Sequence, residues 1–407
     1  MVPFQDDDYG FKTRPLIAIC HLGWDWVWQR PQQFLSRLAK TRPVLFVETH
    51  RTVSPVSHTR TRPAHGHENV TILEIHLPAE RWCDGDYIDR ERRLVLKDRL
   101  TGEFQGRYDQ ALLWFNDPMA VTAYAGHLGE AMIVYDCMDE LSQFNGAPRA
   151  LIERERELTR CADVVFCGGQ AMRAKRLPLN NNTHFYGTGV DCTHFGSVLT
   201  DELLVDPDVA GLPGPVLGYF GVIDERIDYD LLAALADANP AWSVAMVGPF
   251  AKIDPAALPR RHNLHWLGAR PYDRLPALTK GFSVCLMPFA LNAATEYINP
   301  TKALEYMAAG RPVVSTSLGE VRANFAKVAR IAKTPAEFIK MCREEVAAPS
   351  RVRVQRGLQL AADNTWDAIT RKMEEHFRAF LSRRPTSDAQ VTTFPALTLA
   401  MSRKSYV

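Results

Sequence analysis

The sequence predicts an α/β protein made of two doubly wound domains with parallel sheets. At 407 residues the chain is longer than a single hydrophobic core usually supports. Short apolar runs alternate with longer amphipathic segments, which is typical of βαβ units. This alternation stops and restarts once, near residue 214. We expect the carboxyl ends of both sheets to face one central cleft. Ligands bind at such ends, so the functional residues are sought in the loops that follow strands.

In the first domain, residues 1–200, six apolar runs predict strands and two amphipathic runs predict helices. The strands are expected at 16–23, 43–48, 70–77, 110–116, 132–139 and 163–169, and the helices at 30–41 and 148–162. Residues 51–69 contain turn formers and prolines without periodicity. They are therefore predicted to be a surface excursion.

Glycine, proline and acidic residues then mark a linker that ends near Gly214. The second domain is assigned to residues 201–365. Its strands are expected at 216–221, 242–248, 263–268, 282–289, 312–317 and 329–333, and its helices at 229–239, 272–281, 299–310, 319–328 and 335–346.

A final helix is predicted from Gln359 to Ser382, and residues 385–407 are expected to form a flexible tail. One face of this helix is apolar, so it should pack against a domain. The apolar face consists of Trp366, Ile369, Met373, Phe377 and Phe380.

Composition narrows the function classes. The formal charge of +1 gives no global attraction to nucleic acid, so no nucleic-acid partner is expected. The eight cysteines lack zinc-ligand spacing, which indicates buried thiols in a reducing compartment and no metal site. An acidic N-terminus and the lack of a long apolar run predict a cytoplasmic protein.

The stretch EYINPTKALEYMAAGRPVVST, residues 296–316, carries a helix start suited to an anion. Asn299 is the expected N-cap and Pro300 suits the first turn. Lys302 opposes the helix dipole there, which is favourable if a phosphate lies between them. Glu305 lies one turn further on the same face and could accept hydrogen bonds from a ribose diol. The alternative is a capped surface helix with an i,i+3 ion pair.

The loop GYFGVIDERID, residues 218–228, follows the first strand of the second domain. Gly221 would let a ligand approach the backbone, and Arg226 follows where a diphosphate would lie beside a helix start. The alternative is a strand–turn–helix junction with a solvated arginine. No G-x-G-x-x-G fingerprint is present, which argues against a NAD-dependent dehydrogenase.

The loop HLGWDWVWQRPQQ, residues 21–33, follows the first strand of the first domain. Asp25 or His21 is an alternative base, and the three tryptophans could stack on a sugar or a lipid-linked acceptor. A packed domain edge is the other interpretation of the tryptophans. The candidate acceptor or cleft residues of this loop are Gly23, Trp24, Asp25 and Arg30.

Acidic residues end the strand VYDCMDEL, residues 134–141. Asp136 is interpreted as a structural residue within the sheet. Asp139 is the candidate general base that would deprotonate an acceptor hydroxyl, with a helix N-cap as the alternative. A basic amphipathic stretch, residues 90–100, could contact an anionic membrane or a pyrophosphate-linked acceptor, or could be a solvated helix face.

Four of these stretches together resemble the nucleotide-sugar-dependent glycosyltransferases of the GT-B fold, especially bacterial polysaccharide enzymes. They are EYINPTKALEYMAAGRPVVST, GYFGVIDERID, HWLGARPYDRLP and WVWQRPQQFLSRLA, and the resemblance runs from about Pro15 to the Trp366 helix. It implies that Glu305 holds the donor ribose and that Arg226 and Lys302 bind the diphosphate. It further implies that Leu267 and residues up to 270 line the base pocket, and that the helix at 366–384 crosses back to the first domain.

The resemblance also bears on stereochemistry. The retaining enzymes of this family carry E-x7-E, whereas Glu296 and Glu305 are separated by eight residues and Tyr297 occupies the expected place. Either Glu296 still meets the donor sugar or the first acid is absent. Glu296 is retained as a catalytic candidate, and a retaining outcome is favoured over inversion.

The resulting hypothesis is a glycosyltransferase that needs no cofactor or metal. The donor would be a nucleoside diphosphate sugar, with UDP favoured and GDP possible, and the acceptor a glycan or lipid-linked glycan of cell-surface polysaccharide synthesis. Peripheral contact with the cytoplasmic membrane stays open. A nucleotide-sugar 2-epimerase and a non-catalytic nucleotide-sugar-binding protein are the alternatives. The tryptophan-rich loop and the missing histidine constellation argue against the epimerase.

Overall fold

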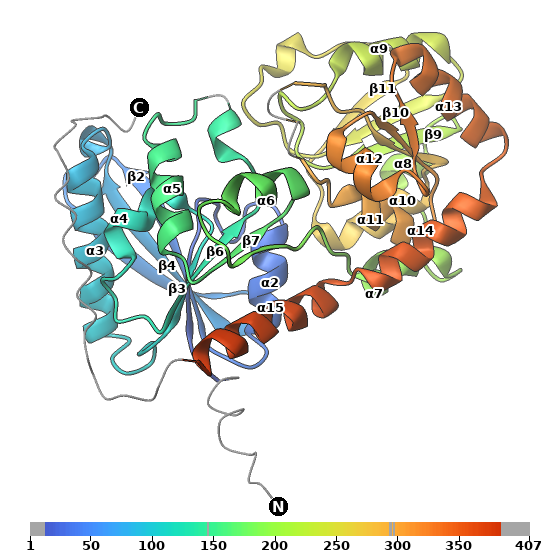
Figure 1. Ribbon diagram of the computed structural model, residues 1–407. Coiled ribbons are helices and arrows are strands. Elements are labelled where there is room, and N and C mark those ends of the chain that lie inside the picture. The colour runs from blue at the N-terminus through green and yellow to red at the C-terminus, as the bar shows by residue number, and fades with distance from the viewer. Residues whose placement is uncertain (1–12, 145, 293–294, 296–297, 384–407) are drawn as a thin grey trace, which may run out of the picture. The chain divides into compact units, whose positions relative to one another are not determined.

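The structure is a computed structural model that describes residues 13–144, 146–292, 295 and 298–383 (Figure 1). The chain forms two compact units: Met1–Tyr186 with Thr370–Val407, and Gly187–Ile369. These divisions differ from the sequence-based ones at residues 200 and 365. The tail at 385–407 lies outside the described residues.

The first unit contains an eight-stranded sheet in the order β3-β4-β2-β1-β5-β6-β7-β8. All neighbours are parallel except β3, which runs antiparallel to β4. The strands β1, β5, β6 and β7 are buried throughout, as expected for parallel strands covered on both faces. The strands are β1 (Leu16–Ile19), β2 (Val44–Thr52), β3 (His58–Ala64), β4 (His67–Pro78), β5 (Leu112–Phe115), β6 (Met132–Cys137), β7 (Val164–Cys167) and β8 (Thr183–Phe185).

Helices flank this sheet (Figure 1). The α-helices are α2 (Arg30–Leu38), α3 (Gly85–Thr101), α4 (Val121–Tyr124), α5 (Leu151–Cys161) and α6 (Gln170–Arg176). Three short 3-10 helices are η1 (Ala79–Arg81), η2 (Pro118–Ala120) and η3 (Leu141–Gln143).

Residues 51–69, predicted to be a surface excursion, instead belong largely to strands of the sheet. Strand β2 continues to Thr52, and β3 and β4 form an antiparallel hairpin around Gly66, which has a φ of 75°. Strand β3 lies at the sheet edge and pairs only with β4, so it needs no apolar face and tolerates Pro63. Its alternating threonines, Thr59 and Thr61, are the pattern that indicates a strand here.

The second unit contains a six-stranded parallel sheet in the order β11-β10-β9-β12-β13-β14. The strands are β9 (Val216–Phe220), β10 (Ser243–Val247), β11 (Leu264–Gly268), β12 (Val284–Met287), β13 (Val313–Thr316) and β14 (Arg330–Ala332). The helices are α7 (Cys192–Gly196), α8 (Pro207–Ala210), α9 (Tyr229–Ala238), α10 (Leu275–Lys280), α11 (Lys302–Ala308), α12 (Gly319–Phe325), α13 (Pro335–Ala347) and α14 (Arg351–Asp363), with the 3-10 helices η4 (Ser197–Leu199), η5 (Pro255–Ala257) and η6 (Tyr272–Arg274).

The single helix predicted from Gln359 to Ser382 is two helices, α14 and α15 (Trp366–Leu381), the last drawn in red in Figure 1. The helix breaks because Val190 takes the backbone hydrogen bonds at the junction. Its N–H donates to Asn364 O (3.0 Å), and its carbonyl accepts from Trp366 N (3.2 Å). A Cβ on Gly189 would lie 2.7 Å from the Trp366 ring, so only glycine fits there.

From Thr370 onward, α15 belongs to the first unit and completes its core. The ring of Phe377 lies 6.0 Å from that of Trp114 and 5.9 Å from that of Phe166. Nη2 of the buried Arg42 lies 2.5 Å from Oε1 of Glu374. The predicted apolar face of this helix is therefore the face that packs.

A buried ion pair joins α2 to the centre of the first sheet. Arg30 Nη2 lies 2.7 Å from Asp136 Oδ1, and both side chains are almost inaccessible to water. Arg30 also donates to the carbonyl of Tyr186 (2.8 Å), and Asn116 Nδ2 donates to Asp136 Oδ2 (3.1 Å). These contacts occupy the Arg30 guanidinium, which the sequence had suggested for a cleft loop, and place Asp136 in a structural role.

We expect Arg30→Met to destabilise the first unit by about 3–5 kcal/mol, because it leaves the Asp136 charge buried without its partner. Urea denaturation of wild type and variant measures this. Arg149→Met is the matched control, since Arg149 lies on the surface of the same unit. Equal losses in the two variants would contradict a special role for the buried pair.

Candidate functional site

Glycines end three neighbouring strands of the second unit and bring their loops close together. Gly221 follows β9, Gly248 follows β10 and Gly268 ends β11, with φ angles of 139°, 152° and 72°. A Cβ on Gly248 would collide with the carbonyl of Gly221, so the two backbones touch. All three φ angles are rare for residues with a side chain. At the carboxyl edge of this sheet, the loops after β9 and β10 are therefore packed backbone against backbone.

Lys302, the first residue of α11, lies directly over Gly221. A Cβ on Gly221 would overlap Cε of Lys302 and would lie 2.5 Å from its Nζ. The ammonium is also 5.4 Å from the centre of the Tyr219 ring. Two sequence candidates from loops far apart in the chain are thus in contact. The helix start differs from the prediction, because Thr301 rather than Asn299 precedes the first helical residue.

Glu305 lies one turn after Lys302 and is buried, with 8% of its surface exposed. Burial raises the pKa of its carboxyl from 4.5 to about 7, against the opposing effect of the Lys302 ammonium. The neighbouring Tyr306 is also buried, and its hydroxyl accepts a hydrogen bond from Phe220 N (3.1 Å). This bond ties α11 to the end of β9.

Arg226 also lies at this edge, held by a carboxylate of its own loop. Its Nη2 is 2.7 Å from Asp224 Oδ2, and its Nε donates to Asp224 Oδ1 (2.8 Å). Burial raises the pKa of Tyr219, and the charge of Arg226 opposes this shift, so the two side chains lie within electrostatic reach. An anion that binds Arg226 would share it with Asp224.

Two donor-side candidates remain, Leu267 and Asn299. Leu267 is half-buried in β11, and Asn299 is half-buried just before α11. In the loop after β11, Arg270 pairs with Asp208 (Nε–Oδ2 2.7 Å). Glu296 lies outside the described residues.

In the first unit, the loop of Gly23, Trp24 and Asp25 is anchored to two strands. Trp24 N donates to Glu48 Oε1 (2.8 Å) on β2, and Asp25 Oδ2 lies 2.7 Å from Nη1 of Arg62 on β3. Trp24 is buried, with its ring 5.2 Å from that of Phe46, which supports the packed interpretation for this tryptophan. The loop after β6 carries Asp139, which is half-buried. Its neighbour Glu140 forms an ion pair with Arg176 (Oε2–Nη1 2.9 Å).

Several residues at the carboxyl edge of the second sheet escaped sequence reasoning. Recurrent glycine at strand ends was a readable signal for one of them, whereas the tyrosines looked like ordinary core residues. These residues are Tyr219, Asp224, Gly248 and Tyr306.

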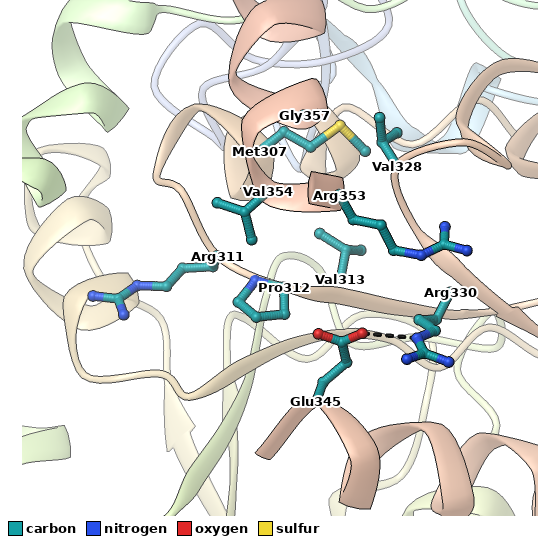
Figure 2. A pocket seen from close by; sticks show the side chains of 10 residues that line it. All are labelled: Met307, Arg311, Pro312, Val313, Val328, Arg330, Glu345, Arg353, Val354 and Gly357. Atoms are coloured by element: carbon teal, nitrogen blue, oxygen red, sulfur yellow. Dashed lines mark hydrogen bonds and ion pairs between the residues drawn. The ribbon is translucent and has the colours of Figure 1, made fainter. Parts of the chain in front are cut away.

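A pocket in the same unit lies elsewhere, between α11 and α14 (Figure 2). Val313 and Arg330, at the starts of β13 and β14, line it, so it opens at the amino edge of the sheet. There Arg330 Nε donates to Oε1 of the buried Glu345 (2.7 Å). The pocket therefore differs from the edge that holds Lys302 and Glu305.

The described part of the chain lacks two features, a metal-binding cluster and a membrane-spanning helix. It contains no cluster of three or more histidine, cysteine, aspartate or glutamate side chains able to hold a metal ion. Within the same residues, no helix is both long and apolar enough to cross a membrane.

The fold agrees with comparisons to known proteins. Residues 214–344 match the family model described as glycosyl transferases group 1, so the second unit carries such a domain. The chain is 25% identical over 254 residues to the putative teichuronic acid biosynthesis glycosyltransferase TuaH of Bacillus subtilis. That match covers 58% of this chain and 63% of TuaH, less than two thirds of its length.

Solved structures establish the fold. An E. coli trehalose-6-phosphate protein with bound UDP-2-fluoro glucose has a TM-score of 0.66 at 14% identity, covering 89% of this chain and 99% of that one. Sucrose-phosphate synthase from Thermosynechococcus elongatus has a TM-score of 0.66 at 15% identity, and the match covers 91% of this chain and 99% of that one. Anabaena HepE in complex with UDP has a TM-score of 0.59 at 16% identity, and the match covers 90% of this chain and 100% of that one. The chain has the GT-B fold, as predicted.

The raised pKa of Glu305 makes stability depend on pH. Between the ordinary value of 4.5 and about 7, the folded chain keeps this proton and the unfolded chain releases it. Rising pH therefore favours unfolding in this window. We expect Glu305→Gln to remove this loss, so that the wild type becomes progressively less stable than the variant up to about pH 7. Urea denaturation at pH values below, within and above this window measures the stability of both proteins. A stability difference that does not change with pH would contradict the prediction.

Proposed function

We propose that this protein is a glycosyltransferase that moves a sugar from a UDP-sugar to a hydroxyl of a glycan or lipid-linked glycan during cell-surface polysaccharide synthesis, with UDP as the leaving group. One observation carries the proposal: the Lys302 ammonium lies over the bare backbone of Gly221, with Glu305 one turn away. The match to group 1 glycosyl transferases, the UDP ligands of structural neighbours and the TuaH likeness support it.

In this proposal, Lys302 and Arg226 neutralise the negative charge that develops on the departing diphosphate. Gly221 leaves room for the Lys302 side chain to reach the phosphates, and Glu305 accepts hydrogen bonds from the ribose hydroxyls. Leu267 lies against the base, and Asn299 contributes a polar group at the start of α11. Because side-chain cations supply the charge, the proposed transfer uses no metal and no cofactor.

On the acceptor side, we propose that Asp139 accepts the proton of the attacking hydroxyl and that Gly23, Trp24 and Asp25 belong to the acceptor loop. A general base must lie within hydrogen-bond distance of that proton. Glu296 is proposed to face the donor sugar, with retention of anomeric configuration. The anomer of the first product, read by NMR, distinguishes retention from inversion.

Nucleotide binding is the direct test of the donor site. We expect UDP to raise the melting temperature of the wild type by mass action. Lys302→Ala should weaken UDP binding by about 10- to 100-fold, because it removes a charge-assisted hydrogen bond worth about 1.5–3 kcal/mol. Titration calorimetry measures the affinity.

Lys327→Ala is the control for this test, since Lys327 is an exposed lysine of the same unit. GDP and ADP, titrated beside UDP, report the base preference. If UDP binds wild type and Lys302→Ala equally, the proposed phosphate site is wrong.

Replacement of Asp139 by Asn should lower turnover by about 100-fold or more while UDP affinity stays unchanged, since a general base contributes at that scale. Sugar transfer to a membrane-extracted acceptor fraction measures turnover. Asp109→Asn, an exposed change in the same unit, is the control. Full activity in Asp139→Asn would exclude this residue as the base.

A further inference from the structure

The loop between β2 and β3 presents two valines to solvent. The relative solvent-accessible surface of Val53 is 101%, as in an extended chain, and that of Val56 is 67%. Single exposed apolar side chains on a protein surface need no explanation. Two in one short loop, which joins two strands that both pair with β4, are a feature of that loop.

Hydrogen bonds hold this loop in place, so its valines point outward from a braced turn. Ser54 Oγ donates to the carbonyl of Val56 (3.0 Å). Ser57 Oγ donates to Glu91 Oε2 on α3 (2.8 Å) and lies 3.3 Å from the hydroxyl of Tyr87. The loop is thereby fastened to α3.

Arginines stacked on aromatic rings surround the loop. The Arg51 guanidinium lies 4.7 Å from the Trp82 ring, and those of Arg81 and Arg90 lie 4.1 and 5.5 Å from the Tyr87 ring. We call this region the valine-loop surface; it comprises Arg51, Val53, Val56, Arg81, Trp82, Tyr87 and Arg90.

The composition of the valine-loop surface indicates its partner. Two valines bury far less than the roughly 1,000 Å² that a stable protein interface needs. Aliphatic tips beside tryptophan, tyrosine and arginine suit the interface of a bilayer, where rings lie at headgroup level and arginines reach phosphate. We propose that this surface docks on a lipid bilayer, with Val53 and Val56 inserted at the headgroup boundary.

Charge plays the smaller part in this docking. Asp84 lies 2.6 Å from Arg81 and neutralises it, and Glu80 and Asp86 are exposed nearby. Anionic lipid should therefore strengthen binding only modestly, through Arg51 and Arg90. The purpose of the contact rests on the proposed function, because a lipid-linked acceptor lies in the membrane.

Vesicle co-sedimentation of the full chain tests the proposal. The probes are phosphatidylcholine vesicles with and without added phosphatidylglycerol. The double variant Val53→Asp with Val56→Asp should partition about 10-fold less, because charged side chains replace inserted apolar ones. Val352→Asp is the matched control, since Val352 is 58% exposed on α14 of the other unit. It should bind vesicles as the wild type does.

Other outcomes overturn the proposal. It fails if the wild type binds neither vesicle, or if the double variant binds as well as the wild type. It also fails if the loop changes dissociate a dimer in size-exclusion chromatography without affecting vesicle binding, which would identify a second copy as the partner. The UDP melting shift, measured on all three proteins, checks folding. Vesicle binding without a UDP shift in the wild type would instead refute the proposed function.

Discussion

The absence of side chains at Gly221 and Gly248 is the constraint on which the carboxyl edge of the second unit depends. Their backbones touch, and the Lys302 side chain occupies the space that a Cβ on Gly221 would need. A side chain at position 248 would collide with the backbone of Gly221, and one at position 221 would displace the end of the Lys302 side chain. Both positions also have φ angles that are rare for residues with a side chain. The position of the Lys302 ammonium therefore depends on Gly221.

The same edge balances opposite charges at short range. Asp224 holds Arg226, while Glu305 is buried enough that its proton is retained to near neutral pH. A bound dianion would therefore compete with Asp224 for Arg226. Ligand binding exchanges the Arg226–Asp224 pair for an Arg226–ligand pair. Arg226 therefore contributes less binding free energy than an arginine with no carboxylate partner would.

Sequence reasoning found the fold because covered parallel strands are apolar throughout, as in β1, β5 and β6. It missed β3 because an edge strand paired on one side carries no such signal. The rule that ligand loops lie after strands led to Gly221 and the helix start led to Lys302, but the contact between them was not predicted. The capture of Arg226 by Asp224, the pairing of Arg30 with Asp136 and the burial of Glu305 could not be read from spacing, because each depends on side-chain packing.

The last helix has a consequence for the order in which the protein is made. Phe377 and Glu374 contribute to the first unit, against Trp114 and Arg42, although more than 200 residues separate each pair along the chain. The first unit to leave the ribosome is thus the last to be finished, since its sheet waits for α15 until the second unit has been synthesised. During translation its aromatic face must stay uncovered or be shielded by a chaperone.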